Sequence, residues 1–147
     1  MAVSALGAAA GQPALATARA VGTGGDKTPV LGSKAFAGPS GSGWGTYEPS
    51  EVYNGGDPSG MVKDIVWSHW GDAVSIGTGK TWIFKPEGGY YPSPVTAELR
   101  ASDLGHCTLH GPLAYRHLGS REPSKPGGKL GPWFPWSDAP TLCKFGF

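Results

Sequence analysis

Residues Val95–Ser102 alternate strictly between apolar and polar side chains, and this pattern restricts the fold more than any other feature. An extended chain would place the two sets on opposite faces: Val95, Ala97, Leu99 and Ala101 against Thr96, Glu98, Arg100 and Ser102. A period of two predicts a half-buried β-strand. A helix is the alternative for residues 97–104, because Ala, Glu, Leu and Arg are good helix formers. The alternation and the prolines that precede it favour the strand.

A β-hairpin is predicted immediately upstream. Residues 61–70 form its first strand, with Met61, Ile65 and Trp67 on one face and Val66 and Trp70 on the other. Gly71-Asp72 is a two-residue turn signal, and residues 73–78 run back as the second strand. Residues 81–84 extend this strand or form a third, and residues 113–121 are a fourth candidate.

The composition explains how such strands are connected. The chain has 25 Gly and 14 Pro, which interrupt long regular elements, and 11% aromatic residues, which can drive a core. Short strands joined by tight turns satisfy both observations. The predicted fold class is therefore all-β, a small antiparallel β-sandwich or barrel with Gly/Pro-rich loops and one disulfide.

The length of 147 residues fits one domain. Residues 1–20 are Ala-rich, free of acidic residues and end in small-x-small triplets, which is typical of a signal peptide. They carry no Lys or Arg before Arg19, so a merely Ala-rich leader is the alternative. Residues 21–43 are predicted to be a flexible Gly/Ser/Pro-rich spacer, and residues 44–147 a single β domain.

The cysteine pair agrees with export. Cys107 and Cys143 are the only two cysteines, and an even pair in an exported chain predicts a disulfide. We therefore expect a secreted, extracellular protein closed by a Cys107–Cys143 bridge. Two unrelated thiols in a cytosolic protein are the alternative.

Charge and hydropathy exclude two classes of partner. The chain has 12 Lys and Arg against 11 Asp and Glu, with no basic run, so nucleic-acid binding is not expected. No apolar run approaches the roughly eighteen residues of a transmembrane helix. No cofactor is expected.

Metal and catalytic motifs fail when their spacing is considered. His106 and His110 flank Cys107 in a compact cluster, but a disulfide would remove this cysteine as a ligand, so no metal site is predicted. Gly77–Thr81 resembles the end of a phosphate-binding loop, but Val74 stands where the first glycine is needed, and a turn or bulge is expected. No serine completes a nucleophile elbow and no pair of carboxylates is selected by its spacing, so no catalytic residue is predicted.

Aromatic residues near turns are the main functional signal. Exposed Trp and Tyr can stack on sugar rings or accept a partner's apolar side chains. The alternative is that they fill the core. The candidate binding residues are Trp133, Phe134, Trp136, Tyr90 and Tyr91.

One short motif suggests a resemblance. Trp67-Ser68-His69-Trp70-Gly71, followed by Ala73, Gly77 and Gly79, resembles a W-x-x-W-G-x-A signature of small exported actinobacterial proteins of unknown function. Residues 91–99 and 114–118 look like its continuation. The resemblance implies a secreted β-rich domain and transfers no active site. Those proteins often carry more cysteines, so the bridge expected above rests on this sequence alone.

Together these observations predict a secreted, non-enzymatic binding or accessory module at the cell surface. Its partner would be a cell-wall glycan or a surface protein. A secreted hydrolase that acts on the cell envelope is the alternative function.

Overall fold

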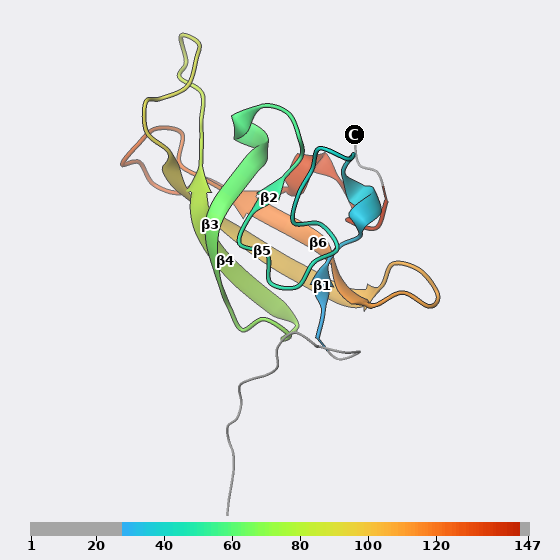
Figure 1. Cartoon of the computed structure of the whole chain (residues 1–147). Coiled ribbons are helices and arrows are strands. Elements are labelled where there is room, and N and C mark those ends of the chain that lie inside the picture. Colours follow the sequence, from blue (N-terminus) through green and yellow to red (C-terminus); the bar gives the residue numbers. More distant parts are fainter. Residues whose placement is uncertain (1–27, 145–147) are drawn as a thin grey trace, which may run out of the picture.

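The computed structural model describes residues 28–144, and strands dominate this part of the chain (Figure 1). The longest helical segments within it are three-residue 3₁₀ turns: η4 (Lys34–Phe36), η5 (Pro58–Gly60) and η6 (Trp136–Asp138). The strands are β1 (Val30–Leu31), β2 (Val52–Tyr53), β3 (Met61–Ser68), β4 (Val74–Thr81), β5 (Val95–His106), β6 (Leu113–Arg121) and β7 (Phe134–Pro135). The all-β prediction is confirmed.

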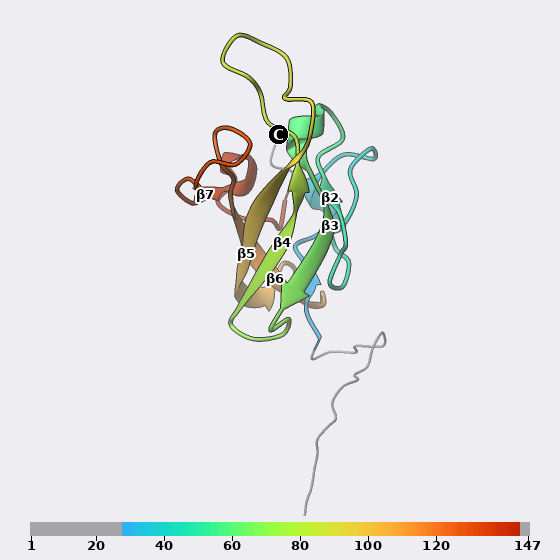
Figure 2. The same ribbon diagram turned by 90° about the vertical axis from the view of Figure 1, so that its left-hand side faces the viewer.

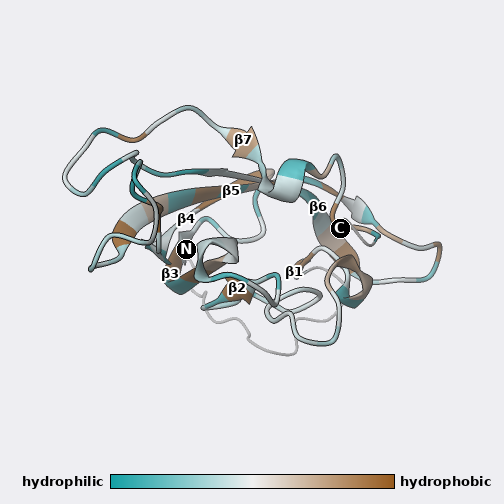
Figure 3. Cartoon of the chain, turned by 90° about the horizontal axis from the view of Figure 1, so that it is seen from above, coloured by the Kyte–Doolittle hydropathy of each residue, from teal (hydrophilic) through white to brown (hydrophobic). Residues whose placement is uncertain are grey.

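The seven strands form one curled sheet, a half-barrel with the order β1-β6-β5-β4-β3-β2. The sheet is mixed because β1 runs parallel to β6, whereas the other pairs are antiparallel. Strand β7 pairs with β6 beyond the two residues that β1 covers. The sheet curves around the segments that precede β3, as the view from above shows (Figure 3).

Strand β5 carries the alternation expected from the sequence. Val95, Ala97, Leu99 and Ala101 are buried, and the polar residues between them are half-buried or exposed on the outer face. The predicted hairpin is also present, since β3 and β4 pair in antiparallel fashion through the Gly71-Asp72 turn region. The fourth candidate strand is β6, with the predicted bounds.

The assignment of faces on β3 was partly wrong. Ile65 and Trp67 share one face and Val66 lies on the other, as predicted; the first face is buried and Val66 is exposed, but Val62 and not Met61 joins the buried set. The register shifts between Lys63 and Val66, and Asp64 has a left-handed φ of 55°. A bulge adds one residue and therefore reverses which side chains face the core.

Trp70 also lies on the side opposite to the one predicted. His69, with φ of 61°, ends the extended conformation, so the period of two does not reach Trp70. The ring packs inward, 4.8 Å from that of Trp67 and 4.9 Å from that of Tyr115. Its indole nitrogen donates a hydrogen bond to the Pro29 carbonyl.

Gly77–Thr81 is not a turn, as the sequence had suggested, but the second half of β4. Gly77 and Gly79 face the core at positions where a side chain does not fit. A Cβ on Gly77 would lie 2.8 Å from the Trp67 ring, and one on Gly79 would lie 2.7 Å from the Lys63 carbonyl oxygen. These glycines let β3 carry Trp67 close against β4.

The packed part of the chain begins earlier than the predicted boundary at Trp44. Leu31 and Phe36 are fully buried, and the segment between β1 and β2 crosses from one end of the strand order to the other. Residues 28–43 are therefore part of the domain and not a spacer. The predicted leader, residues 1–20, and residues 21–27 lie outside the described residues.

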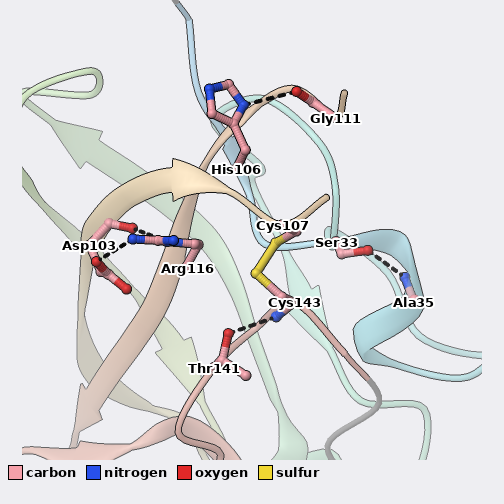
Figure 4. Close-up of a disulfide and its surroundings, with 9 residues drawn as sticks. All are labelled: Ser33, Ala35, Asp103, His106, Cys107, Gly111, Arg116, Thr141 and Cys143. Carbon is pink, nitrogen blue, oxygen red and sulfur yellow. Dashed lines mark hydrogen bonds and ion pairs between the residues drawn. A yellow bond between two sulfur atoms is a disulfide. The ribbon is translucent and has the colours of Figure 1, made fainter. Parts of the chain in front are cut away.

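The predicted Cys107–Cys143 disulfide is confirmed, with a Cα–Cα distance of 5.0 Å (Figure 4). It joins the end of β5 to the arm that follows β7. Beside it Leu142 is fully buried and its amide donates a hydrogen bond to the Arg116 carbonyl. The bridge therefore fixes the C-terminal arm at the point where the arm completes the core.

Candidate functional site

Two adjoining hollows lie where β4 and β6 end, beside η5. The first has a volume of about 290 Å³ and the second about 220 Å³. They share three lining residues, Ser59, Thr81 and Glu122, and we call them together the loop-end hollow. The remaining residues of the first are Trp82, Ile83, Phe84, Pro123 and Ser124, and those of the second are Asn54, Gly60, Val62, Ser120, Trp136 and Ser137.

The segment between β4 and β5 supplies one wall of this hollow. It projects beyond the sheet in both side views (Figures 1 and 2). Phe84 and Tyr90 form an isolated bridge, and their rings stack 4.4 Å apart with an interplanar angle of 21°. Phe84 is nevertheless 53% exposed. A supported aromatic ring therefore faces solvent at the hollow.

Glu122 supplies the only charge among the lining residues. It directly follows β6, and its carbonyl accepts a hydrogen bond from the Gly131 amide, which closes the loop of residues 122–131. Its carboxylate has no hydrogen-bond or ion-pair partner among the residues that the structure describes. Glu122 is exposed to solvent, but partial desolvation of its carboxyl by the surrounding residues raises its pKa above the ordinary value for a glutamate.

Trp136 forms part of the second hollow and is otherwise a core residue. It is 6% exposed, and its indole nitrogen donates a hydrogen bond of 2.8 Å to Asn54 Oδ1. Asn54 in turn donates to Ser137 Oγ at 2.6 Å. The side chains of Asn54 and Ser137 are thus held in fixed positions by the buried indole of Trp136. For Trp136 the structure thus shows the core position that the sequence left open as the alternative.

Trp133 lies on the outer face of the sheet and not in the hollow. Its ring is 4.6 Å from the Arg100 guanidinium and 4.5 Å from that of Arg121. Arg121 also donates two hydrogen bonds to Glu98. Both guanidiniums are in cation–π contact with the indole, so the Trp133 side chain attaches the segment that precedes β7 to the sheet.

The other two predicted binding residues, Phe134 and Tyr91, do not line the loop-end hollow. Phe134, on β7, is 57% exposed, and its backbone is paired with Ser120, which lines the second hollow. Tyr91 is half-buried, and its amide donates a hydrogen bond to the Ile83 carbonyl. Of the predicted binding residues, Trp136 therefore lines the loop-end hollow, and Tyr90 reaches it through its stacking contact with Phe84. Trp133 lies apart from it, on the outer face of the sheet.

Sequence reasoning missed the residues that give the hollow its chemistry. Glu122 was one of several carboxylates among which spacing selected no pair. Phe84 was assigned only to a possible strand extension. The sequence did indicate where Glu122 lies, because this residue directly follows a predicted strand and precedes a proline. It did not indicate which residues from other segments would surround Glu122.

The histidines do not contribute to this site. His69 lies in the β3–β4 turn, 3.8 Å from Asp72, and His106 contacts the Gly111 carbonyl beside the disulfide. Within residues 28–144 no three His, Cys, Asp or Glu side chains lie close enough together to hold a metal ion. In the same residues no helix has the length and apolar character that crossing a bilayer requires.

A separate hollow of about 310 Å³ lies beside the disulfide. Val30, Cys107, Pro112 and Ala114 give it an apolar wall, and Lys34 is its single charged residue. Its lining contains neither a carboxylate nor an aromatic ring, both of which the loop-end hollow has.

Comparisons with known proteins gave no relative: no family model, no curated protein and no solved structure matches the chain. The function must therefore be argued from the site.

Proposed function

We propose that this chain is a secreted, non-enzymatic binding module at the cell surface, and that its ligand is a cell-wall glycan held in the loop-end hollow. The observation that carries the proposal is the position of Glu122. A carboxylate without a protein partner lies in a hollow that also exposes an aromatic ring.

The chemistry of this hollow suits a sugar. A pyranose ring presents an apolar face of C–H groups, which can pack on Phe84, and hydroxyls, which need acceptors and donors. Glu122 offers two acceptor oxygens. The side chains of Ser59, Ser120 and Ser124 have no hydrogen-bond partner within the described residues. They are therefore available to ligand hydroxyls.

Two properties support a location outside the cell. Disulfides form and persist in oxidising compartments, and this one is built into the core at Leu142. The Ala-rich leader expected from the sequence would direct export.

A hydrolase remains the alternative because a glutamate with a raised pKa has the property of a general acid. Glycoside hydrolysis normally needs a second carboxylate at a defined separation. The linings of the loop-end hollow contain no Asp, His, Cys or second Glu. Binding without turnover is thus the function that these residues support best.

The test is retention of the purified protein on isolated cell wall. We expect wild type to bind and Phe84→Ala to bind about tenfold more weakly, a loss of about 1.4 kcal/mol. Leu109→Ala is the matched control, because it also removes an exposed apolar side chain (88% exposed) but lies in the turn between β5 and β6.

Two results would overturn the proposal. One is a wild-type protein that is not retained on cell wall. The other is an equal loss of binding in the Phe84 and Leu109 variants, which would indicate non-specific adhesion. Release of soluble sugars from the wall by wild type but not by Glu122→Gln would establish the hydrolase instead.

A further inference from the structure

We infer that the ligand of the loop-end hollow is a cationic glycan, one whose sugars carry free, protonated amino groups in place of acetamido groups. This inference rests on the proposed function and names the class of sugar. It follows from the charge of the hollow and from the position of its aromatic rings.

The lining of the hollow carries one charged side chain, and that side chain is acidic. Of the residues that line it, Glu122 alone is charged, and none is Lys or Arg. Arg121, which directly precedes Glu122 in the sequence, bonds with Glu98 and contacts Trp133, both on the outer face. A ligand ammonium would supply the partner that the protein does not provide.

The aromatic residues strengthen the same preference. Trp82, Phe84 and Trp136 line the hollow, and the face of an aromatic ring carries negative electrostatic potential. A protonated amine near such a face is attracted, whereas a carboxylated or phosphorylated sugar is repelled by both the rings and Glu122. Neutral sugars gain the stacking interaction alone.

The state of Glu122 agrees with this assignment. Partial desolvation raises the pKa of its carboxyl. A neighbouring ammonium would favour the ionised form. The carboxylate would then form a charge-assisted hydrogen bond, which is shorter and stronger than a neutral one.

The side chains around Glu122 fit a sugar and not a simple amine. Asn54 and Ser137 are held by the Trp136 hydrogen bond, and the Ser59 and Ser120 hydroxyls border the same space. These groups can bond several ring hydroxyls at once. A lysine side chain would leave them without partners.

The experiment is calorimetric titration of the whole protein with two oligosaccharides of equal length and linkage. One is a glucosamine hexamer, the other an N-acetylglucosamine hexamer, both at a pH at which the free amines are protonated. We expect the glucosamine hexamer to bind at least tenfold more tightly. Glu122→Gln should reduce this ratio to about twofold or less, and Phe84→Ala should weaken both oligomers.

The matched control is Glu87→Gln. It changes the net charge equally, but Glu87 is an exposed residue on the β4–β5 segment and does not line the hollow. We expect it to retain the wild-type preference. A similar loss of preference in the Glu87 and Glu122 variants would overturn the assignment to this site.

The failures of the two proposals are distinguishable. Equal binding of both hexamers by wild type would overturn the cationic inference and leave the glycan-binding function in place. Failure to bind either hexamer or cell wall would overturn both. Tighter binding of Nα-acetyl-lysine amide than of the glucosamine hexamer would also overturn the inference, because the ligand would then be a peptide amine.

Discussion

The Tyr115 hydroxyl donates a hydrogen bond of 2.6 Å to the Asp72 carbonyl oxygen, although the two residues are 43 positions apart. The same hydroxyl accepts a hydrogen bond of 2.8 Å from the Gly71 amide. A fully buried ring on β6 thus holds both residues of the β3–β4 turn in place. Burial raises the pKa of Tyr115, the Gly71 amide opposes this effect, and Asp72 adds to it.

Removal of this hydroxyl should loosen the turn without leaving a large cavity. Tyr115→Phe is expected to lower the free energy of unfolding by about 1–2 kcal/mol, because two hydrogen bonds are lost. Chemical denaturation measures the change. Tyr90→Phe is the control, since the Tyr90 hydroxyl has no hydrogen-bond partner in the described part of the chain. Equal midpoints for Tyr115→Phe and wild type would contradict the role of the hydroxyl.

Gly77 should tolerate no side chain. A Cβ there would lie 2.8 Å from Trp67 Cε3 and 2.9 Å from Ile65 Cγ2, so Gly77→Ala is expected to cost about 1–3 kcal/mol through overpacking. Gly38→Ala is the matched control because nothing lies within 4 Å of its added Cβ, and it should change stability by less than about 0.5 kcal/mol. Comparable losses in the two variants would show that the close approach of β3 to β4 is not the cause.

The disulfide should contribute much of the stability. It closes a loop with a sequence separation of 36, and replacement of both cysteines by alanine is expected to cost about 4 kcal/mol. The unfolding midpoint in denaturant, measured for the double variant and for wild type under non-reducing conditions, gives the difference. A midpoint unchanged from wild type would mean that the packing of Leu142 alone holds the arm.

Glu122 should make the domain less stable at neutral pH than it would be with a neutral side chain. Because folding raises the pKa of Glu122, its stabilising contribution is complete below the ordinary glutamate range and is lost as pH rises through the folded-state value. Glu122→Gln is therefore expected to have a higher Tm than wild type at pH 7, and the difference should vanish near pH 3.

Thermal unfolding of both proteins across this pH range measures the effect, with Glu87→Gln as the control, which should match wild type at both ends. A Glu122→Gln variant less stable than wild type at pH 7 would mean that the carboxylate has a stabilising partner. The combination of greater stability and weaker binding in one variant is characteristic of a residue retained for its ligand.

Local patterns predicted the central strands because burial on a sheet follows the period of two. Val95–Ala101 and the bounds of β6 agree with the sequence for this reason. The same rule failed for Met61 and Trp70, because single residues with positive φ, Asp64 and His69, interrupt the alternation between the residues before and after them. Aspartate and histidine at these positions are compatible with an ordinary strand, so the sequence did not mark the changes.

The site was less predictable because it depends on contacts between distant segments. The loop-end hollow joins Asn54, Phe84, Glu122 and Trp136, which lie on four separate connections. Composition correctly drew attention to aromatic residues. It could not separate Trp133, which is enclosed by two arginines, from Phe84, which is available to a ligand.

The burial of Leu142 also restricts when the domain can form. Gly32 lies directly against Leu142, where a Cβ on Gly32 would be only 2.6 Å from the leucine Cβ, and the Ser33 amide donates to the Leu142 carbonyl. The first and last parts of the described chain therefore complete the core together. A nascent polypeptide that lacks residue 142 lacks one side of the contact at Gly32, so this part of the core cannot close until synthesis has passed this residue.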